Sequence, residues 1–197
     1  GFNSKGQLGD GTTTSSGTPV AVSGISNAVD IAAGGNFSCA VLGTGAAQCW
    51  GEGTNGKLGR GSSTDSLTPV AVTGITTATQ LAAGYDYACA RLSSGAVQCW
   101  GIGSYGRLGQ GTTSSSSVPV STKNVSNALA VSTGAVHTCA LLATGALQCW
   151  GDNSLGQLGI GGTAQNSAPV AVANLTGIGT VAVPLLALAL HLGPVPL

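Results

Sequence analysis

The sequence predicts an all-β protein made of four-stranded antiparallel β-propeller blades. Three observations support this prediction: a tandem repeat, short apolar segments within each repeat, and turn-forming residues between those segments. Gln-Cys-Trp-Gly at residues 48–51 returns at residues 98–101 and 148–151, so the period is 50 residues. The Gly-x-Leu-Gly run at residues 6–9 and the Pro-Val pair at residues 19–20 each return three times in the same register. A repeat of this length matches one propeller blade.

Each copy contains four candidate strands. In the first copy they are residues 19–22, Ala28–Ala33, Phe37–Leu42 and residues 46–50, each bounded by Gly, Ser, Asn or Thr. Such clusters mark turns between strands. No part of the repeats sustains the i, i+3, i+4, i+7 apolar pattern of an amphipathic helix.

The copies start near residues 1, 51, 101 and 151, so residues 1–183 form one domain of about four tandem repeats. Four units of this size are fewer than most closed propellers need, which predicts an incomplete or open propeller. Blade faces are apolar because neighbouring blades normally bury them, so the open faces are candidate surfaces for self-association. Because the chain starts inside a repeat, we expect it to be a piece of a longer protein.

Composition limits the possible functions. Six basic and six acidic residues give a formal net charge of zero, and charged residues make up only 6% of the chain. Nucleic-acid-binding proteins gather Lys and Arg into a basic patch, whereas the basic residues here are scattered singly. We therefore expect no nucleic-acid partner. The hydrophobic content of 43% and the strict period argue against disorder.

Six cysteines form three equivalent pairs, each centred on a turn. If residues 37–50 form a hairpin that turns at residues 43–45, Cys39 lies directly opposite Cys49, within reach of a disulfide. The same register pairs Cys89 with Cys99 and Cys139 with Cys149. Free buried thiols and a zinc site are the alternatives, but a zinc site needs four ligands and no histidine repeats with the cysteines. Disulfides predict an extracellular, periplasmic or cell-surface location.

Catalytic chemistry is not indicated. The six carboxylates form no repeated pair suited to acid–base catalysis, and no Gly-x-Ser-x-Gly elbow precedes a helix. His137 stands at a strand start in one copy only, which favours a structural role. We expect no enzyme activity, no cofactor and no metal.

Two sets of residues have expected roles. The tryptophans and the leucines of the Gly-x-Leu-Gly run should form the repeat core: Trp50, Trp100, Trp150, Leu8, Leu58, Leu108 and Leu158. The segments that vary between copies, residues 10–18, 60–68, 110–118 and 160–168, are candidate binding loops, because loops on a rigid scaffold commonly carry recognition. Their candidate contact residues are Asp10, Thr14, Arg60, Asp65, Gln110, Ser115, Gln165 and Asn166. These loops are small, polar and weakly charged, which favours a protein or glycan partner.

The last 14 residues break the pattern. Residues 184–197 form an atypical apolar tail, where the Cys-Ala motif of the earlier copies does not return. The charge-free stretch from Gly177 onward is about long enough to span a membrane. Pro184, Pro194 and Pro196 interrupt it, and no Lys or Arg flanks it. A truncated or altered terminus is favoured over a membrane segment.

The run Trp150-Gly-Asp-Asn-Ser-Leu-Gly-Gln-Leu-Gly159 and the upstream residues 134–141 resemble the regulator-of-chromosome-condensation repeat family. The resemblance covers about residues 1–183 and implies a seven-bladed propeller in the complete protein. The cysteine-paired version resembles the bacterial secreted or surface branch. The family's His-Thr pair is present at residues 137–138 but is replaced at residues 37–38 and 87–88.

Two functional hypotheses follow. The first is a non-catalytic binding or scaffold propeller, secreted or on the cell surface. The second, implied only by the family resemblance, is a guanine-nucleotide-exchange-type regulator of a small GTPase. Members of one fold family serve unrelated functions, so the resemblance alone does not decide between them.

Overall fold

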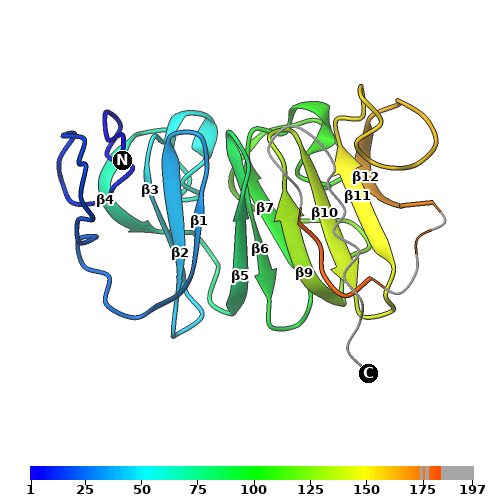
Figure 1. Ribbon diagram of the computed structural model, residues 1–197, viewed down its shortest axis with the longest axis horizontal. Coiled ribbons are helices and arrows are strands. Elements are labelled where there is room, and N and C mark those ends of the chain that lie inside the picture. Colours follow the sequence, from blue (N-terminus) through cyan, green and yellow to red (C-terminus); the bar gives the residue numbers. More distant parts are fainter. Residues whose placement is uncertain (174, 176–177, 183–197) are drawn as a thin grey trace.

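The computed structural model describes residues 1–173, 175 and 178–182 (Figure 1), so the expected apolar tail at residues 184–197 lies outside the described residues. Twelve strands form three four-stranded sheets. The first sheet contains β1 (Ala28–Ala33), β2 (Phe37–Leu42), β3 (Ala47–Gly51) and β4 (Ser66–Ala71). The second contains β5 (Ala78–Ala83), β6 (Tyr87–Leu92), β7 (Val97–Gly101) and β8 (Ser116–Ser121). The third contains β9 (Ala128–Thr133), β10 (His137–Leu142), β11 (Leu147–Gly151) and β12 (Asn166–Ala171).

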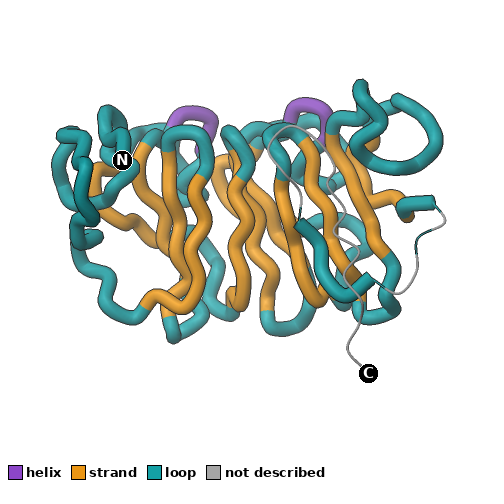
Figure 2. The backbone as a smooth tube through the Cα atoms, in the orientation of Figure 1, coloured by secondary structure: helices purple, strands orange, loops and turns teal. Residues whose placement is uncertain are grey.

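The predicted all-β architecture of antiparallel four-stranded blades is confirmed. Consecutive strands in each sheet are hydrogen-bonded neighbours, and the three sheets stand side by side in an open arc (Figure 2). The only helical segments among the described residues are two single 3-10 turns, η1 (Thr54–Gly56) and η2 (Ser104–Gly106). None of the sheets formed by the described residues closes on itself, as predicted for an open propeller.

The blade is offset from the sequence copy. The Pro-Val segment of each copy pairs with the preceding copy's third strand, so the first blade runs from β1 to β4 and takes its last strand from the second copy. The prediction of a strand at residues 19–22 was wrong for this reason. No preceding third strand lies beside these residues, and without one they form no strand. The third strand of the first blade starts at Ala47 and ends at Gly51, one residue later at each end than predicted.

The predicted hairpin register is confirmed in all three blades. Cys39 is the cross-strand partner of Cys49, Cys89 of Cys99, and Cys139 of Cys149. Each pair forms a disulfide, and none of the six cysteines is free. The turn is symmetric about residues 44, 94 and 144, so the cysteines face each other on the same side of the ladder.

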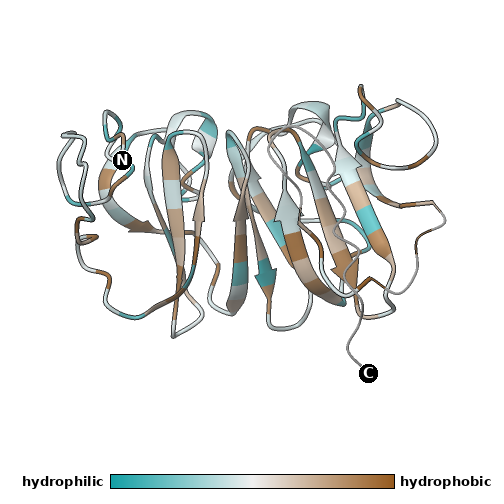
Figure 3. Ribbon diagram, viewed as in Figure 1, coloured by the Kyte–Doolittle hydropathy of each residue, from teal (hydrophilic) through white to brown (hydrophobic). Residues whose placement is uncertain are grey.

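The buried apolar residues form three clusters, and the first lies between the first and second blades. Strand β1 lies against β5, and β5 lies against β9, so these three strands line the inner side of the arc. One face of the first hairpin presents Phe37, Cys39 and Val41 to the second blade. Leu81 and Trp100 of that blade join the same cluster, together with Leu58 of the β3–β4 connection. Apolar residues accordingly concentrate on the strands, while near-neutral and polar residues predominate in the loops (Figure 3).

The Leu-Gly pair of each of the first three copies lies against the tryptophan that ends the same copy. The indole N–H of Trp100 donates to the carbonyl oxygen of Lys57 at 3.0 Å. Gly59 has φ of 69°, and a Cβ there would lie 2.8 Å from the Trp100 indole nitrogen. Trp50 and Trp150 donate in the same way to Gln7 and Arg107.

Six of the seven expected core residues are buried. The buried members of the set are Trp50, Trp100, Trp150, Leu58, Leu108 and Leu158. Leu8, at the open end of the arc, is only partly buried.

Candidate binding face

One edge of the arc gathers two kinds of loop from every blade. The turns between the first and second strands are residues 34–36, 84–86 and 134–136, and the connections between the third and fourth strands are residues 52–65, 102–115 and 152–165. Because antiparallel strands alternate in direction, both kinds of loop leave the sheet at the same edge. This edge, with residues 2–15 of the N-terminal segment, is called the loop face here, and it is uppermost in Figure 1.

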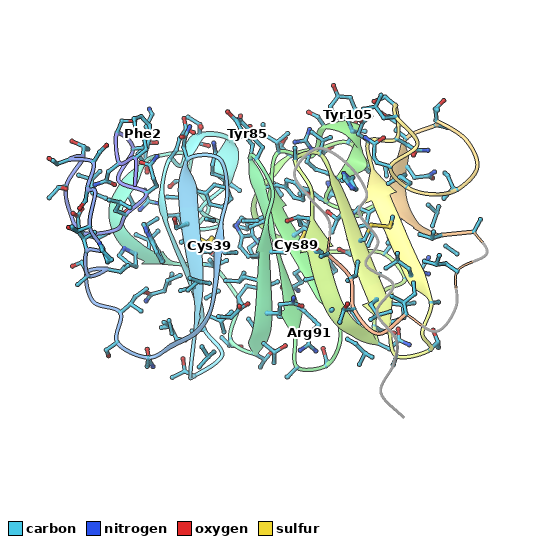
Figure 4. All side chains as sticks on the ribbon, viewed as in Figure 1. Phe2, Cys39, Tyr85, Cys89, Arg91 and Tyr105 are labelled. Carbon is cyan, nitrogen blue, oxygen red and sulfur yellow. A yellow bond between two sulfur atoms is a disulfide. The ribbon has the colours of Figure 1, made fainter. Side chains whose placement is uncertain are left out.

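The loop face carries exposed aromatic side chains. Tyr85 is 52% exposed in the turn before β6, and Tyr105 is 47% exposed in η2. Phe2 and Leu155, at 65% and 83%, are the other large apolar side chains exposed in these segments. Figure 4 shows Phe2, Tyr85 and Tyr105 along one edge, with Arg91 at the opposite edge. Sequence reasoning missed these residues. For Tyr105 and Leu155 the signal was an apolar residue at a copy position that holds Lys5 and Asn55 in the other copies. For Tyr85 it was an aromatic residue where the other copies have Gly35 and Ala135.

Tyr105 has a backbone conformation that tyrosine rarely adopts. Its φ is 62°, in the left-handed region, and the equivalent Asn55 has φ of 60°. This conformation costs most residues roughly 1–2 kcal/mol, and asparagine tolerates it better. The Arg107 guanidinium lies 5.5 Å from the Tyr105 ring centre and 5.6 Å from that of Tyr87. These cation–π contacts hold the tyrosine in place.

Charged groups beneath the loop face join neighbouring blades. Lys57, only 1% exposed, pairs with Glu52 at 2.8 Å and also with Asp86 of the next blade. The hydrogen bond from Lys57 lowers the pKa of Glu52, although partial burial opposes this shift. Burial disfavours the charge on Lys57, but the hydrogen bonds to Asp86 and Glu52 outweigh it and raise the Lys57 pKa. Glu52 and Lys57 are therefore ionised at neutral pH, and the contact of Lys57 with Asp86 joins the second blade to the first.

Most of the candidate loop residues form hydrogen bonds within their own loops. Asp65 Oδ1 accepts the Gly53 N–H at 2.9 Å, and Ser115 Oγ accepts the Gly103 N–H at 3.0 Å. Asp10 accepts hydrogen bonds from Thr12, which lower its pKa.

The corresponding residues of the next two copies act similarly. The Arg60 side chain donates to the Thr64 carbonyl at 3.0 Å, and the Gln110 side chain donates to the Ser114 carbonyl at 2.7 Å. These hydrogen bonds use side-chain donors with which a ligand would otherwise bond.

The remaining candidates differ in exposure. Thr14 and Gln165 are exposed, while Asn166 lies in β12 and pairs with Gly151. Seven of the eight candidates lie in four separate loops spaced along the arc, with Asn166 at the start of β12, and they do not converge on one point. The structure therefore offers an extended surface on the loop face, not a pocket built by these residues.

Among the described residues, no three His, Cys, Asp or Glu side chains gather where they could hold a metal ion. His137 is buried at the start of β10, and its Nε2 has no hydrogen-bond partner within the described part of the chain. Burial lowers the His137 pKa, and the charge of Asp152 partly offsets this. In the part of the chain that the structure describes, no helix is long and apolar enough to cross a membrane.

Solved structures share this fold. The structure of human WBSCR16 is 26% identical over 94% of this chain and 50% of its own, with a TM-score of 0.80. Prp20p from Saccharomyces cerevisiae, described with its binding to Gsp1p and histones, is 19% identical over 77% of this chain and 39% of its own, with a TM-score of 0.66. Yeast RCC1 (Prp20) bound to Kap60 is 24% identical over 79% of this chain and 38% of its own, with a TM-score of 0.67. The chain thus spans half the length of WBSCR16. It spans 39% and 38% of the lengths of the two yeast chains.

No curated protein sequence matches the chain. The model of the regulator of chromosome condensation (RCC1) repeat matches residues 1–41, 45–91, 94–141 and 144–183. A second model of the same repeat matches residues 28–57, 78–107 and 129–157. These matches cover most of the chain in four consecutive units. The chain belongs to the RCC1 repeat family.

Proposed function

We propose that this chain is a non-catalytic binding propeller that acts in an oxidising compartment and recognises a protein or glycan through its loop face. The RCC1-repeat fold supports a binding or regulatory role. The observation that carries the proposal is the set of exposed apolar side chains, Tyr85, Tyr105 and Leu155, on one edge of a disulfide-closed scaffold.

Tyrosine suits either class of partner. Its ring buries a large apolar area with few rotatable bonds, while its hydroxyl forms hydrogen bonds. Protein interfaces are enriched in exposed aromatic anchors, and sugar rings pack their apolar faces against aromatic rings. The strained φ of 62° at Tyr105 supports a functional reason for the tyrosine, because backbone strain is commonly retained at functional sites.

The disulfides support the proposal of an oxidising compartment. Three buried disulfides are typical of extracellular, periplasmic or cell-surface proteins. Exchange activity on a small GTPase has no specific support here, because the likeness to the yeast structures is below 25% identity and concerns the fold alone.

Binding of the oxidised chain to a glycan array and an extracellular-protein array tests the proposal. A Tyr85→Ser/Tyr105→Ser variant should lose most of the signal on whichever array responds. The matched control is Val29→Ser/Leu129→Ser, which removes exposed apolar area from the inner strands, where these residues are 67% and 58% exposed. Equal loss in both variants, or no signal for the native chain on either array, would contradict the proposal.

A further inference from the structure

One cation beneath the loop face has no acidic partner among the described residues. Arg107 is only 5% exposed, and it forms no ion pair with any carboxylate of those residues. Its side chain donates to two backbone carbonyl oxygens, from Nε to Ser104 at 2.9 Å and from Nη1 to Ala135 at 3.5 Å. Burial lowers the pKa of Arg107, and the charges of Asp86 and Asp152 oppose this only from a longer distance.

The preceding copy shows how such a cation is neutralised. Lys57 stands fifty residues before this arginine, is 1% exposed and pairs with both Glu52 and Asp86. In the next copy the residues equivalent to these two acids are Ile102 and Val136, which carry no charge. The junction of the second and third blades therefore keeps the cation of the preceding junction and lacks its two carboxylates.

Arg107 lies beside an exposed aromatic ring of the loop face. Its guanidinium carbon is 5.5 Å from the centre of the Tyr105 ring and 5.6 Å from that of the buried Tyr87. Tyr105 is 47% exposed, on the edge opposite to Arg91 (Figure 4). A partner that packs on Tyr105 therefore also covers the exposed part of Arg107. Covering an unpaired cation costs free energy unless the partner supplies the opposite charge.

We propose that Arg107 binds the carboxylate of one Asp or Glu side chain on a protein partner, next to an apolar residue of that partner that packs on Tyr105. The inference rests on the proposed function and specifies the chemistry of the partner. The carboxylate does for Arg107 what Glu52 and Asp86 do for Lys57.

The small exposed area of Arg107 favours a protein over a glycan. A carboxylate at the end of a flexible side chain reaches a nearly buried guanidinium more readily than one attached directly to a sugar ring. A neutral or basic group at the same place leaves the cation unpaired, so partners without the acid are rejected.

The probe is a displayed library of random linear peptides, selected on the oxidised chain. Peptides that the Tyr85→Ser/Tyr105→Ser variant no longer binds are kept, because they contact the loop face. These peptides should share an Asp or Glu next to an apolar residue. Synthetic versions with that acid changed to Asn or Gln should bind the native chain at least about tenfold less tightly in calorimetric titration.

Arg107→Gln should weaken binding of the acidic peptide by a similar factor. Glutamine is compatible with this position, because Gln7 and Gln157 occupy it in other copies. The peptide without the acid should bind Arg107→Gln and the native chain equally, since one partner of the pair is already missing. Arg107→Lys keeps the charge and should retain most of the affinity, because Lys57 occupies the equivalent position.

An acid supplied by the chain itself gives a second test. Val136→Asp copies Asp86 and places a carboxylate at the position that pairs with the cation of the preceding copy. This carboxylate should compete with the peptide and weaken its binding at least about tenfold, while thermal unfolding shows that the variant is folded.

The matched control is Arg91→Gln, which removes the same charge at the opposite edge (Figure 4). Like Arg107, Arg91 forms no ion pair with the carboxylates of the described residues. This variant should bind the acidic peptide like the native chain.

Peptides that need the tyrosines but share no acid, or that bind Arg107→Gln as tightly as the native chain, would overturn the inference and leave the proposed function standing. Absence of any peptide that depends on the tyrosines would also overturn it, and the glycan array then decides the proposed function. Binding of polygalacturonate that Arg107→Gln abolishes, without selection of acidic peptides, would assign Arg107 to an acidic glycan and refute the protein partner.

Discussion

The Tyr87 hydroxyl donates a hydrogen bond to the His137 carbonyl oxygen, 2.6 Å away, although the two residues belong to neighbouring blades. The same hydroxyl lies 3.0 Å from Thr138 Oγ1. Burial raises the Tyr87 pKa, so the phenol stays protonated and remains a donor. One aromatic side chain thus joins the second blade to the third by apolar packing and by hydrogen bonding.

Tyr87→Phe should lower the free energy of unfolding by about 1–2 kcal/mol, because it leaves buried acceptors without their donor. Phenylalanine fits the site sterically, since Phe37 occupies the equivalent position. Urea denaturation measures the change. Tyr85→Phe, at a residue 52% exposed, is the control and should change stability little. If Tyr87→Phe changed the free energy of unfolding no more than Tyr85→Phe does, the buried hydroxyl would add nothing to blade stacking.

Replacing both cysteines of the middle hairpin, Cys89→Ser and Cys99→Ser, should lower the free energy of unfolding by about 3 kcal/mol. The disulfide closes a short loop in the unfolded chain, and the two hydroxyls would be buried in an apolar cluster. Chemical denaturation measures the loss. Peptide mapping of the native chain without reductant should recover only bridges between cysteines ten residues apart. A bridge between two repeats would refute the assigned register.

Stability should fall as the pH drops below about 6.5, in part because of His137. Burial lowers its pKa from the ordinary value of 6.5, so between the lowered value and 6.5 the unfolded chain binds more protons than the folded chain. His137→Phe, which copies Phe37, should flatten the pH dependence in that window. Thermal unfolding from pH 7 to 5 measures it. An unchanged slope in the variant would assign the pH dependence to other groups.

Lys57→Met should lower the free energy of unfolding by about 3 kcal/mol at pH 7, because it leaves Glu52 and Asp86 beside each other without their cation. The Glu52 pKa lies below its ordinary value of 4.5, so its contribution is present above pH 4.5 and is lost as the pH falls through the lowered value. The cost of Lys57→Met should therefore shrink in acid. Denaturation at pH 7 and pH 3 compares the two conditions, and an equal cost at both would contradict the ion-pair interpretation.

Tyr105→Asn should raise the free energy of unfolding by about 0.5 kcal/mol. Asparagine adopts the left-handed conformation more readily, and this gain exceeds the loss of an exposed cation–π contact. The same change should weaken binding of the partner at the loop face. Thermal unfolding measures the first effect and array binding the second. A destabilised variant would mean that the backbone of Tyr105 is not strained.

Sequence reasoning predicted the scaffold better than the candidate site. The variable segments end inside the strands β4, β8 and β12, and Asp65 and Ser115 accept hydrogen bonds within their own loops. The exposed Tyr85 and Tyr105 were not singled out, because an aromatic residue in a β-repeat is equally compatible with a core position. Only their places in a turn and in η2 show that the rings point outward.

By itself, the sequence determined the repeat length, the blade architecture and the pairing of all six cysteines. These features are local or periodic: a hairpin turn and a side-chain period of two place Cys39 opposite Cys49 without reference to other copies. Tertiary structure decided which neighbour each residue meets. The Pro-Val strand joins the preceding blade, Lys57 pairs with Asp86 of the next blade, and Leu81 is buried while Ile31 is exposed. The physical reason is that burial and ion pairing depend on the blade alongside, which the repeat period does not specify.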